Sequence, residues 1–220
     1  MLVYKILTKA KRFYSWPLSR KIQYVENLYF RLKTLTIYKY MFRKLGRKCV
    51  IRKPLFLTPE FISLGAGVII WDAARIEAVH NYGEQNFNPS IILGNGVSIQ
   101  QRCHITAAGE LTVGDNTLIS FDVMIQDTDH GYQNLEMPIG EQPLIVKKTK
   151  IGNNCFIGSG AKIQAGTILG KHCVVGTNAV VRGVFPDYCV IVGIPARIIK
   201  RYDESLKEWR RTDSAGLFLN

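Results

Sequence analysis

A histidine stands in a short polar stretch, Asp-Thr-Asp-His-Gly-Tyr, at residues 127–132. A neutral imidazole at hydrogen-bond distance can accept the proton of a hydroxyl group while that hydroxyl attacks a carbonyl carbon. Asp127 or Asp129 could fix the tautomer of the ring, and a backbone carbonyl could do so equally well. His130 is therefore a candidate for a general base, although a histidine in a polar loop, taken alone, is more often an ordinary surface residue.

The stretch interrupts a sequence that otherwise repeats every six residues. From Ile151 the chain reads IGNNCF, IGSGAK, IQAGTI, LGKHCV, VGTNAV and VRGVFP. Each unit opens with a branched aliphatic residue, most continue with glycine, and a small residue usually takes the fifth place. A period of six indicates a β-helix, in which one unit makes a strand and a turn and three units make a triangular coil.

The same period extends upstream, which disfavours the alternative of several ordinary sandwich strands. The sequence contains 18 such units, enough for about six coils, with breaks at residues 58–63, 79–92 and 126–150. The residues that open the units are Leu45, Ile51, Leu57, Leu64, Ile70, Ile76, Leu93, Ile99, Ile105, Val113, Ile119, Ile125, Ile151, Ile157, Ile163, Leu169, Val175 and Val181.

The positions of the cysteines and the hydropathy of the chain limit the class of protein. Cys49, Cys103, Cys155 and Cys173 all occupy the fifth place of a unit, so we expect buried thiols that pack like alanine. Free buried thiols suit the reducing cytoplasm. No stretch approaches the roughly 20 apolar residues of a membrane span, and the N-terminus has no sustained apolar run of the signal-peptide kind.

The positive charge is concentrated at the N-terminus. Residues 1–48 hold 13 of the 29 Lys and Arg residues but only one acidic residue, Glu26, so they account for the whole net charge of +12. Apolar spacing predicts a basic amphipathic helix in residues 1–44, with Ser19 as a cap. Such a helix could contact an anionic membrane, or it could pack on the base of the β-helix. No nucleic-acid-binding motif accompanies the charge.

These features resemble the left-handed β-helix, hexapeptide-repeat acyltransferases, in the branch of galactoside, maltose, serine and bacterial surface-polysaccharide O-acetyltransferases. The resemblance covers residues 45–202 and rests on the repeats, on DTDHGY, on IGNNCFIGSGAKIQAGTILG and on the closing VGIPARIIKRY. We therefore expect an all-β chain with a left-handed parallel β-helix at residues 45–202 and an external loop at 126–150. A helical segment at 1–44 should precede it, and a short C-terminal helix or tail at 203–220 should follow.

The resemblance also implies an active site between subunits. Members of the family form trimers, and their long loop reaches toward the neighbouring subunit. By this resemblance His130 is the base for direct acetyl transfer from acetyl-CoA to a sugar hydroxyl, and the amides of residues 157–160 are candidate oxyanion donors. The acetyl-CoA contacts that it implies are Gly158, Ser159, Gly160, Thr177, Arg197 and Lys200.

The acceptor contacts carry over less well. The galactoside enzymes hold sugar hydroxyls with an aspartate just before an IGDN unit, but Ala107 and Ala108 stand at that place here. The remaining candidates for orienting the base or binding the acceptor are Asp127, Asp129, Tyr132, His104, Tyr82 and Asn86.

The sequence thus predicts a cytoplasmic, homotrimeric, acetyl-CoA-dependent O-acetyltransferase. Its acceptor would be a sugar in surface polysaccharide (O-antigen or capsule) biosynthesis or its lipid-linked precursor, and the basic segment suggests peripheral contact with the inner membrane face. An N-acetyltransferase for a nucleotide-linked amino sugar and a non-catalytic β-helix scaffold are the alternatives. The four histidines, His80, His104, His130 and His172, lack the close pair of a hexapeptide-repeat carbonic anhydrase, so we predict no metal site.

Overall fold

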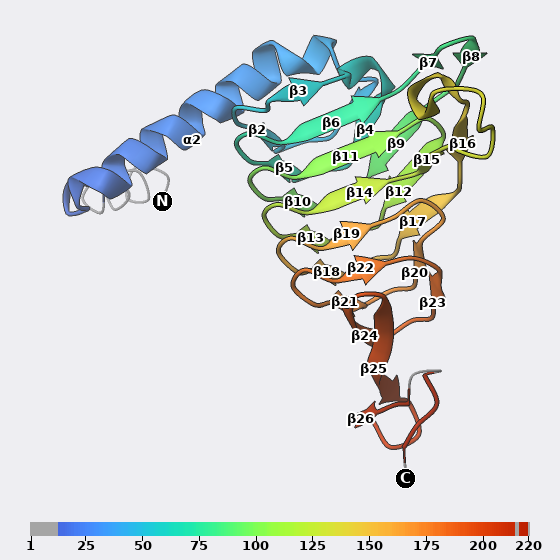
Figure 1. Cartoon of the computed structure of the whole chain (residues 1–220). Helices are drawn as coiled ribbons and strands as arrows, with labels where there is room; N and C mark the ends of the chain where they lie inside the picture. Colours follow the sequence, from blue (N-terminus) through green and yellow to red (C-terminus); the bar gives the residue numbers. More distant parts are fainter. Residues whose placement is uncertain (1–12, 214–215, 220) are drawn as a thin grey trace.

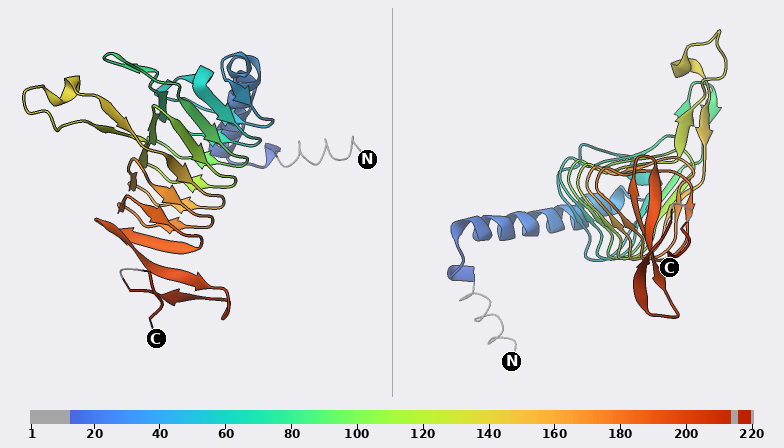
Figure 2. Two further views of the ribbon diagram at one scale, coloured as in Figure 1. Left: turned by 90° about the vertical axis from the view of Figure 1, so that its right-hand side faces the viewer. Right: turned by 60° about the horizontal axis from the view of Figure 1, so that its bottom comes forward.

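The chain folds into a triangular parallel β-helix with a projecting helix at one end and a hairpin at the other (Figures 1 and 2). The structure is a computed structural model that describes residues 13–213 and 216–219. Successive coils stack along one axis, so residues 16 or more positions apart, such as Leu169 and Phe185, become neighbours in the same sheet.

Three sheets form the three faces of the coil. The first face contains β1 (Lys44–Leu45), β4 (Ile62–Leu64), β9 (Ser90–Leu93), β12 (Glu110–Val113), β17 (Thr149–Ile151), β20 (Ile168–Leu169) and β23 (Val184–Phe185). The second face contains β2 (Val50–Ile51), β5 (Ile69–Ile70), β10 (Ser98–Ile99), β13 (Leu118–Ile119), β18 (Phe156–Ile157), β21 (Val174–Val175) and β24 (Cys189–Gly193). The third face contains β3 (Phe56–Leu57), β6 (Arg75–Ala78), β11 (His104–Ala107), β14 (Met124–Gln126), β19 (Lys162–Ile163) and β22 (Val180–Val181).

The register confirms the predicted repeat. Every unit-opening aliphatic residue lies on a strand, and its hydrogen-bonded neighbour one coil away is the residue three units further on, as Ile99 is for Ile70 and Ile119 for Ile99. Ile70, Ile99 and Ile119 are fully buried, as are most of the others. The coil continues beyond Val181, the last residue predicted to open a unit, because Phe185 and Ile191 extend the first and second faces.

The cysteines are packing residues, as predicted. Cys49, Cys103, Cys155 and Cys173 are buried free thiols, and Cys189 joins them. Burial raises the pKa of Cys103 to about 11, which keeps this thiol protonated at neutral pH.

The N-terminal helix stands out from the first coil. Helix α2 (Leu18–Thr36) begins directly after Pro17 and has no side-chain cap, so the prediction that Ser19 caps it is wrong. Its C-terminal part packs on the coil, where Phe30 and Thr34 are buried and the Thr34 hydroxyl accepts a 2.9 Å hydrogen bond from the Ile51 amide. The 3-10 turn η1 (Tyr38–Tyr40) leads into β1. Within the described residues, no helix has both the length and the apolarity needed to cross a bilayer.

The short helix expected at residues 203–220 is wrong. The second face continues instead through the antiparallel strands β25 (Ala196–Asp203) and β26 (Glu208–Arg211). Asp203 accepts hydrogen bonds from the amides of Ser205 and Leu206 and forms an ion pair with Arg210 at 3.0 Å. These contacts turn the chain back on itself where a helix would have continued along its axis.

Two hairpins leave the coil at the edge between the third and first faces, on the side away from α2 (Figure 2). One pairs β7 (Asn81–Tyr82) with β8 (Gln85–Asn86). The longer one pairs β15 (Thr128–His130) with β16 (Leu144–Val146) and carries the turn η3 (Ile139–Glu141) between them. The short hairpin braces the long one, because the Gln85 side-chain amide accepts from the Leu144 amide at 2.7 Å and donates to its carbonyl at 3.3 Å.

Replacing Gln85 by alanine should loosen the long hairpin without unfolding the coil. Two hydrogen bonds to Leu144 are lost, so amide hydrogens of β15 and β16 should exchange roughly tenfold faster in hydrogen-exchange mass spectrometry. Asn86→Ala is the matched control, since this exposed neighbour makes no such bond among the described contacts. Equal exchange rates in the two variants would contradict the bracing role.

Candidate active site

His130 lies at the end of β15, where its backbone pairs with Leu144 and its side chain is exposed. The Tyr82 ring meets the imidazole edge-on, with ring centroids 5.5 Å apart, and the Tyr82 hydroxyl lies 3.4 Å from Nδ1. Because that hydroxyl donates its hydrogen to the Gly140 carbonyl, its oxygen can only accept from the ring. This arrangement favours the tautomer with the hydrogen on Nδ1 and leaves the lone pair of Nε2 free.

A hollow of about 310 Å³ opens beside the imidazole. Its lining residues are Asp129, His130, Tyr132, Gln133, Ile145, Lys147 and Arg182. Asp129 forms ion pairs with Lys147 at 2.9 Å and with Arg182 at 2.8 Å. Partial burial works to raise the pKa of the Asp129 carboxyl, but hydrogen bonds from Lys147 and Arg182 outweigh it and hold the pKa below its usual range. One side of the hollow is therefore lined by charged side chains that ion pairs hold in place.

The two aspartates predicted as partners of the base have other contacts. Asp127 is buried, and its two carboxylate oxygens each accept a 2.8 Å hydrogen bond, from the amides of Ala108 and Gly109. Burial raises the pKa of this carboxyl against the effect of those bonds. Among the described contacts, neither Asp127 nor Asp129 touches the His130 ring, and Tyr82 is the neighbour that does.

The other acceptor candidates divide into two groups. Tyr132 is 66% exposed and lines the hollow, so the structure brings it together with His130. His104 lies at the start of β11, toward the opposite edge of the third face, where partial burial and the charge of Arg75 lower its pKa. Asn86 is exposed on the short hairpin and does not line the hollow.

The predicted acetyl-CoA contacts follow one edge of the coil, between the second and third faces. Ser159 and Thr177 lie on equivalent turns of successive coils, which are joined by the hydrogen bond from the Asn178 amide to the Ser159 carbonyl. Arg197 comes next, because its strand partner Val192 packs beneath Gly176. Lys200 lies further along β25, opposite Val190, and its side chain is exposed, as is that of Arg197.

Glycines in the Ser159 turn are required by the stacking itself. A Cβ on Gly158 would lie 2.7 Å from the Val175 carbonyl oxygen, and Gly160 has a φ of +70°. The Gly158 and Gly160 amides already donate to Val175 and Phe121 of neighbouring coils. The Ser159 amide has no acceptor among the described residues, so this amide of the predicted turn is still available as a donor to a ligand.

The two halves of the predicted site lie apart in one chain. The turns that join β18 to β19 and β21 to β22 are at one edge of the third face, and the β15–β16 hairpin leaves from the other (Figure 1). Reacting groups must approach to about 3–3.5 Å. The strands of the third face intervene, so His130 does not meet the Ser159 turn of its own chain.

Sequence reasoning missed three residues that shape the hollow: Gln85, Lys147 and Arg182. Arg182 is the second residue of the last repeat, 53 positions from its partner Asp129. From the sequence alone, Lys147 and Arg182 are indistinguishable from ordinary charged surface residues. Of the three residues in these ion pairs, only Asp129 could be singled out from the sequence, because it lies inside the DTDHGY stretch.

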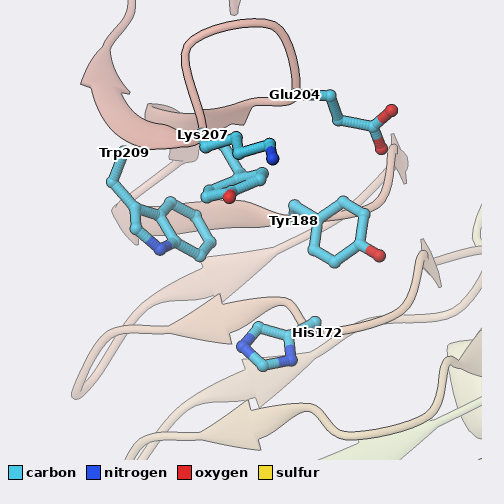
Figure 3. A pocket seen from close by; sticks show the side chains of 6 residues that line it. His172, Tyr188, Glu204, Lys207 and Trp209 are labelled. Carbon is cyan, nitrogen blue, oxygen red and sulfur yellow. The ribbon is translucent and has the colours of Figure 1, made fainter.

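A second hollow, of about 470 Å³, lies at the C-terminal end of the coil (Figure 3). Its lining residues are His172, Tyr188, Tyr202, Glu204, Lys207 and Trp209. The rings of Tyr202 and Trp209 are 5.7 Å apart, and those of Tyr188 and Tyr202 are 5.9 Å apart. These contacts tie the β25–β26 hairpin to the last coils, so this hollow, although larger than that beside His130, is explained by packing of the hairpin.

Comparison with known proteins agrees with the fold. Residues 148–183 match the model of the bacterial transferase hexapeptide (six repeats). A probable acetyltransferase of Mycobacterium tuberculosis is 33% identical over 145 residues, which are 65% of this chain and 46% of that protein. A putative lipopolysaccharide biosynthesis O-acetyl transferase of Escherichia coli is 34% identical over 128 residues, which are 55% of this chain and 65% of that protein. The chain thus spans about half to two thirds of the length of these relatives.

A solved structure supports the same conclusion. The N-acyltransferase AntD from Bacillus cereus, in complex with dTDP and 3-hydroxybutyryl-CoA, superimposes with a TM-score of 0.63 at 18% identity and covers 79% of this chain and 90% of its own. This likeness confirms the predicted fold class, the left-handed parallel β-helix of hexapeptide repeats. Residues 148–183 thus carry the hexapeptide repeats of this transferase family, and the named relatives and the three-faced coil agree with that match.

Proposed function

We propose that this protein transfers the acetyl group of acetyl-CoA to a hydroxyl group of a sugar. The observation that carries the proposal is His130, which stands exposed at a hollow with its Nε2 lone pair free and its Nδ1 facing Tyr82. The family supplies the reaction class, and the named relatives include sugar-directed O-acetyltransferases such as the galactoside enzyme of Escherichia coli.

The chemistry needs one base and one oxyanion donor. His130 Nε2 takes the proton of the acceptor hydroxyl as its oxygen bonds to the thioester carbonyl carbon. The Ser159 amide donates to the negative oxygen of the tetrahedral intermediate. The carbon–sulfur bond then breaks, and the imidazolium returns the proton to the CoA sulfur. Acetyl ester and free thiol are the products, with no acyl-enzyme.

The surrounding residues hold these groups in place. Tyr82 orients the imidazole through its ring edge and its oxygen, and it is itself fixed to Gly140. The Asp129 carboxylate is held by Lys147 and Arg182, which makes it a fixed acceptor for sugar hydroxyls. Tyr132 offers an exposed ring against which the face of a sugar can pack.

A second copy of the chain must complete this site. His130 and the Ser159 edge are on opposite sides of the third face, and only a neighbouring subunit can bring the Ser159 edge of one chain to the His130 of another. A closed ring of three chains satisfies this head-to-tail requirement at every interface, so we include a homotrimer in the proposal. Gly158, Gly160, Thr177, Arg197 and Lys200 would then line the acetyl-CoA side of each cleft, where Arg197 and Lys200 meet phosphates.

The acceptor we favour is a sugar of a surface polysaccharide or of its lipid-linked precursor, modified in the cytoplasm. The support is the relative named for lipopolysaccharide biosynthesis. An amine acceptor on a nucleotide-linked sugar would use the same base, so an acceptor screen must contain both hydroxyl and amine sugars. A non-catalytic scaffold would not require His130 to be exposed beside a hollow.

Acetyl-CoA should bind to the intact protein in calorimetry. Arg197→Ala should raise the dissociation constant roughly tenfold, because a cation–phosphate hydrogen bond is lost. The matched control is Arg211→Ala, an exposed arginine on the adjacent strand β26. Saturable binding with selective loss in Arg197→Ala supports the proposal. Absence of binding by folded protein would leave the scaffold as the better interpretation.

His130→Gln should reduce acetyl transfer by roughly 100-fold to 10,000-fold while acetyl-CoA binding is retained, because only the base is removed. The assay is release of the CoA thiol from acetyl-CoA in the presence of a panel of sugars and amino sugars. His172→Gln is the control, since His172 lies in the aromatic cluster at the C-terminal end. Undiminished turnover in His130→Gln would show that another group is the base.

A further inference from the structure

The apolar side of helix α2 faces away from the protein. Phe30 and Thr34 are its only residues buried against the first coil. On the opposite side, Ile22, Val25 and Leu32 are between 53% and 57% exposed. With 3.6 residues per turn these positions form one continuous stripe. The complete outer face consists of Leu18, Ile22, Val25, Leu28, Tyr29, Leu32 and Leu35.

This orientation is the reverse of the usual one. A surface helix normally turns its apolar stripe toward the core and its charged residues toward water. Here the inner side carries Glu26 and Asn27, which contact Arg52 of the coil at 3.4 Å and 3.1 Å, while the outer face holds seven large apolar side chains. Contiguous exposed apolar surface of this kind marks an interaction site.

The charges beside the outer face select the partner. Arg20, Lys21, Arg31 and Lys33 flank or interrupt the stripe, and Glu26, the one acidic residue of α2, is occupied by Arg52. Two or three copies of α2 packed face to face would bring like charges together without acidic partners, and Lys21 would be buried in the seam. An anionic surface instead attracts all four side chains, and their long stems can reach its head groups.

Aromatic rings at the start of the helix fit the same partner. Trp16 packs against Phe13 and Tyr24, with ring centroids 5.8 Å and 5.7 Å apart, and the Arg20 guanidinium lies 4.5 Å from the Trp16 ring. Tryptophan and tyrosine favour the boundary between acyl chains and head groups because their rings are apolar with a polar edge.

We propose that the outer face of α2 binds the surface of an anionic phospholipid bilayer. The helix lies in the plane of the membrane, with the stripe at the acyl boundary and the basic side chains among the phosphates. Figure 2 shows α2 extending to one side of the coil and the β15–β16 hairpin to the other, so bound lipid leaves the hollow beside His130 open. Binding needs no catalytic residue, and only its use, to hold the enzyme near a lipid-linked acceptor, rests on the proposed function.

The test is cosedimentation of the full chain with vesicles of equal parts phosphatidylglycerol and phosphatidylcholine, and with phosphatidylcholine vesicles alone. The protein should sediment with the anionic vesicles and should be released as salt rises from about 0.1 M to about 1 M, where the screening length falls from about 10 Å to about 3 Å. Val25→Glu/Leu32→Glu should weaken binding at least roughly tenfold, because charge then interrupts the stripe.

Gln23→Glu/Asn27→Glu is the matched control, because it adds the same charge to the same helix away from the stripe and should retain most of the binding. Circular dichroism and light scattering check that both variants keep the fold and the oligomeric state. Failure of the unmodified protein to bind anionic vesicles overturns the proposal. So does a change of oligomeric state in Val25→Glu/Leu32→Glu alone, which would assign the stripe to a contact between copies of the chain. Neither result bears on acetyl transfer, and His130→Gln should bind vesicles like the unmodified protein.

Discussion

The width of the coil interior governs where this protein can do chemistry. Each coil closes on three aliphatic side chains that face small residues, and parallel hydrogen bonds set the coils roughly 4.8 Å apart. Such an interior has no room for a ligand. Binding and catalysis are therefore confined to the edges, where turns of successive coils form a regular row, and to the hairpins that leave the coil. Ser159, Thr177 and Arg197 occupy the first kind of place, and His130 occupies the second.

The same constraint explains why the hairpins need their own supports. A strand of the coil is fixed by neighbours above and below, whereas β15 and β16 have only each other and the short hairpin beside them. Gln85 and Tyr82 supply the missing contacts through Leu144 and Gly140. The ion pairs of Asp129 then attach the hairpin to Lys147 and Arg182. His130, the proposed base, is thus held on an element that the repeat alone would leave loose.

The coil could be predicted because its sequence repeats locally. The site could be predicted only in part, because it depends on contacts between residues far apart in the sequence. Leu45 to Val181 could be placed on faces because every unit repeats the same burial problem, and the buried cysteines followed from the same phase. His130 could be singled out from the sequence because it lies in the DTDHGY stretch. Tyr82 was among the candidates for orienting the base, but its contact with the His130 ring was not predicted, and the role of Arg182 was missed, since each depends on a partner about 50 residues away in an aperiodic segment. The turn in the C-terminal segment was not predicted, because the hydrogen bonds to Asp203 that reverse the chain are not visible in a pattern of hydropathy.

The most direct measurement is a crystal structure of the His130→Asn protein with acetyl-CoA, in which the substitution keeps a polar side chain but removes the base. The account predicts CoA along the edge formed by Ser159, Thr177 and Arg197 of one chain. It also predicts that the thioester carbonyl lies within hydrogen-bond reach of the Ser159 amide and beside residue 130 of a neighbouring chain. CoA bound in the aromatic hollow of Tyr202 and Trp209, or bound on that edge with no residue 130 near the thioester, would contradict it.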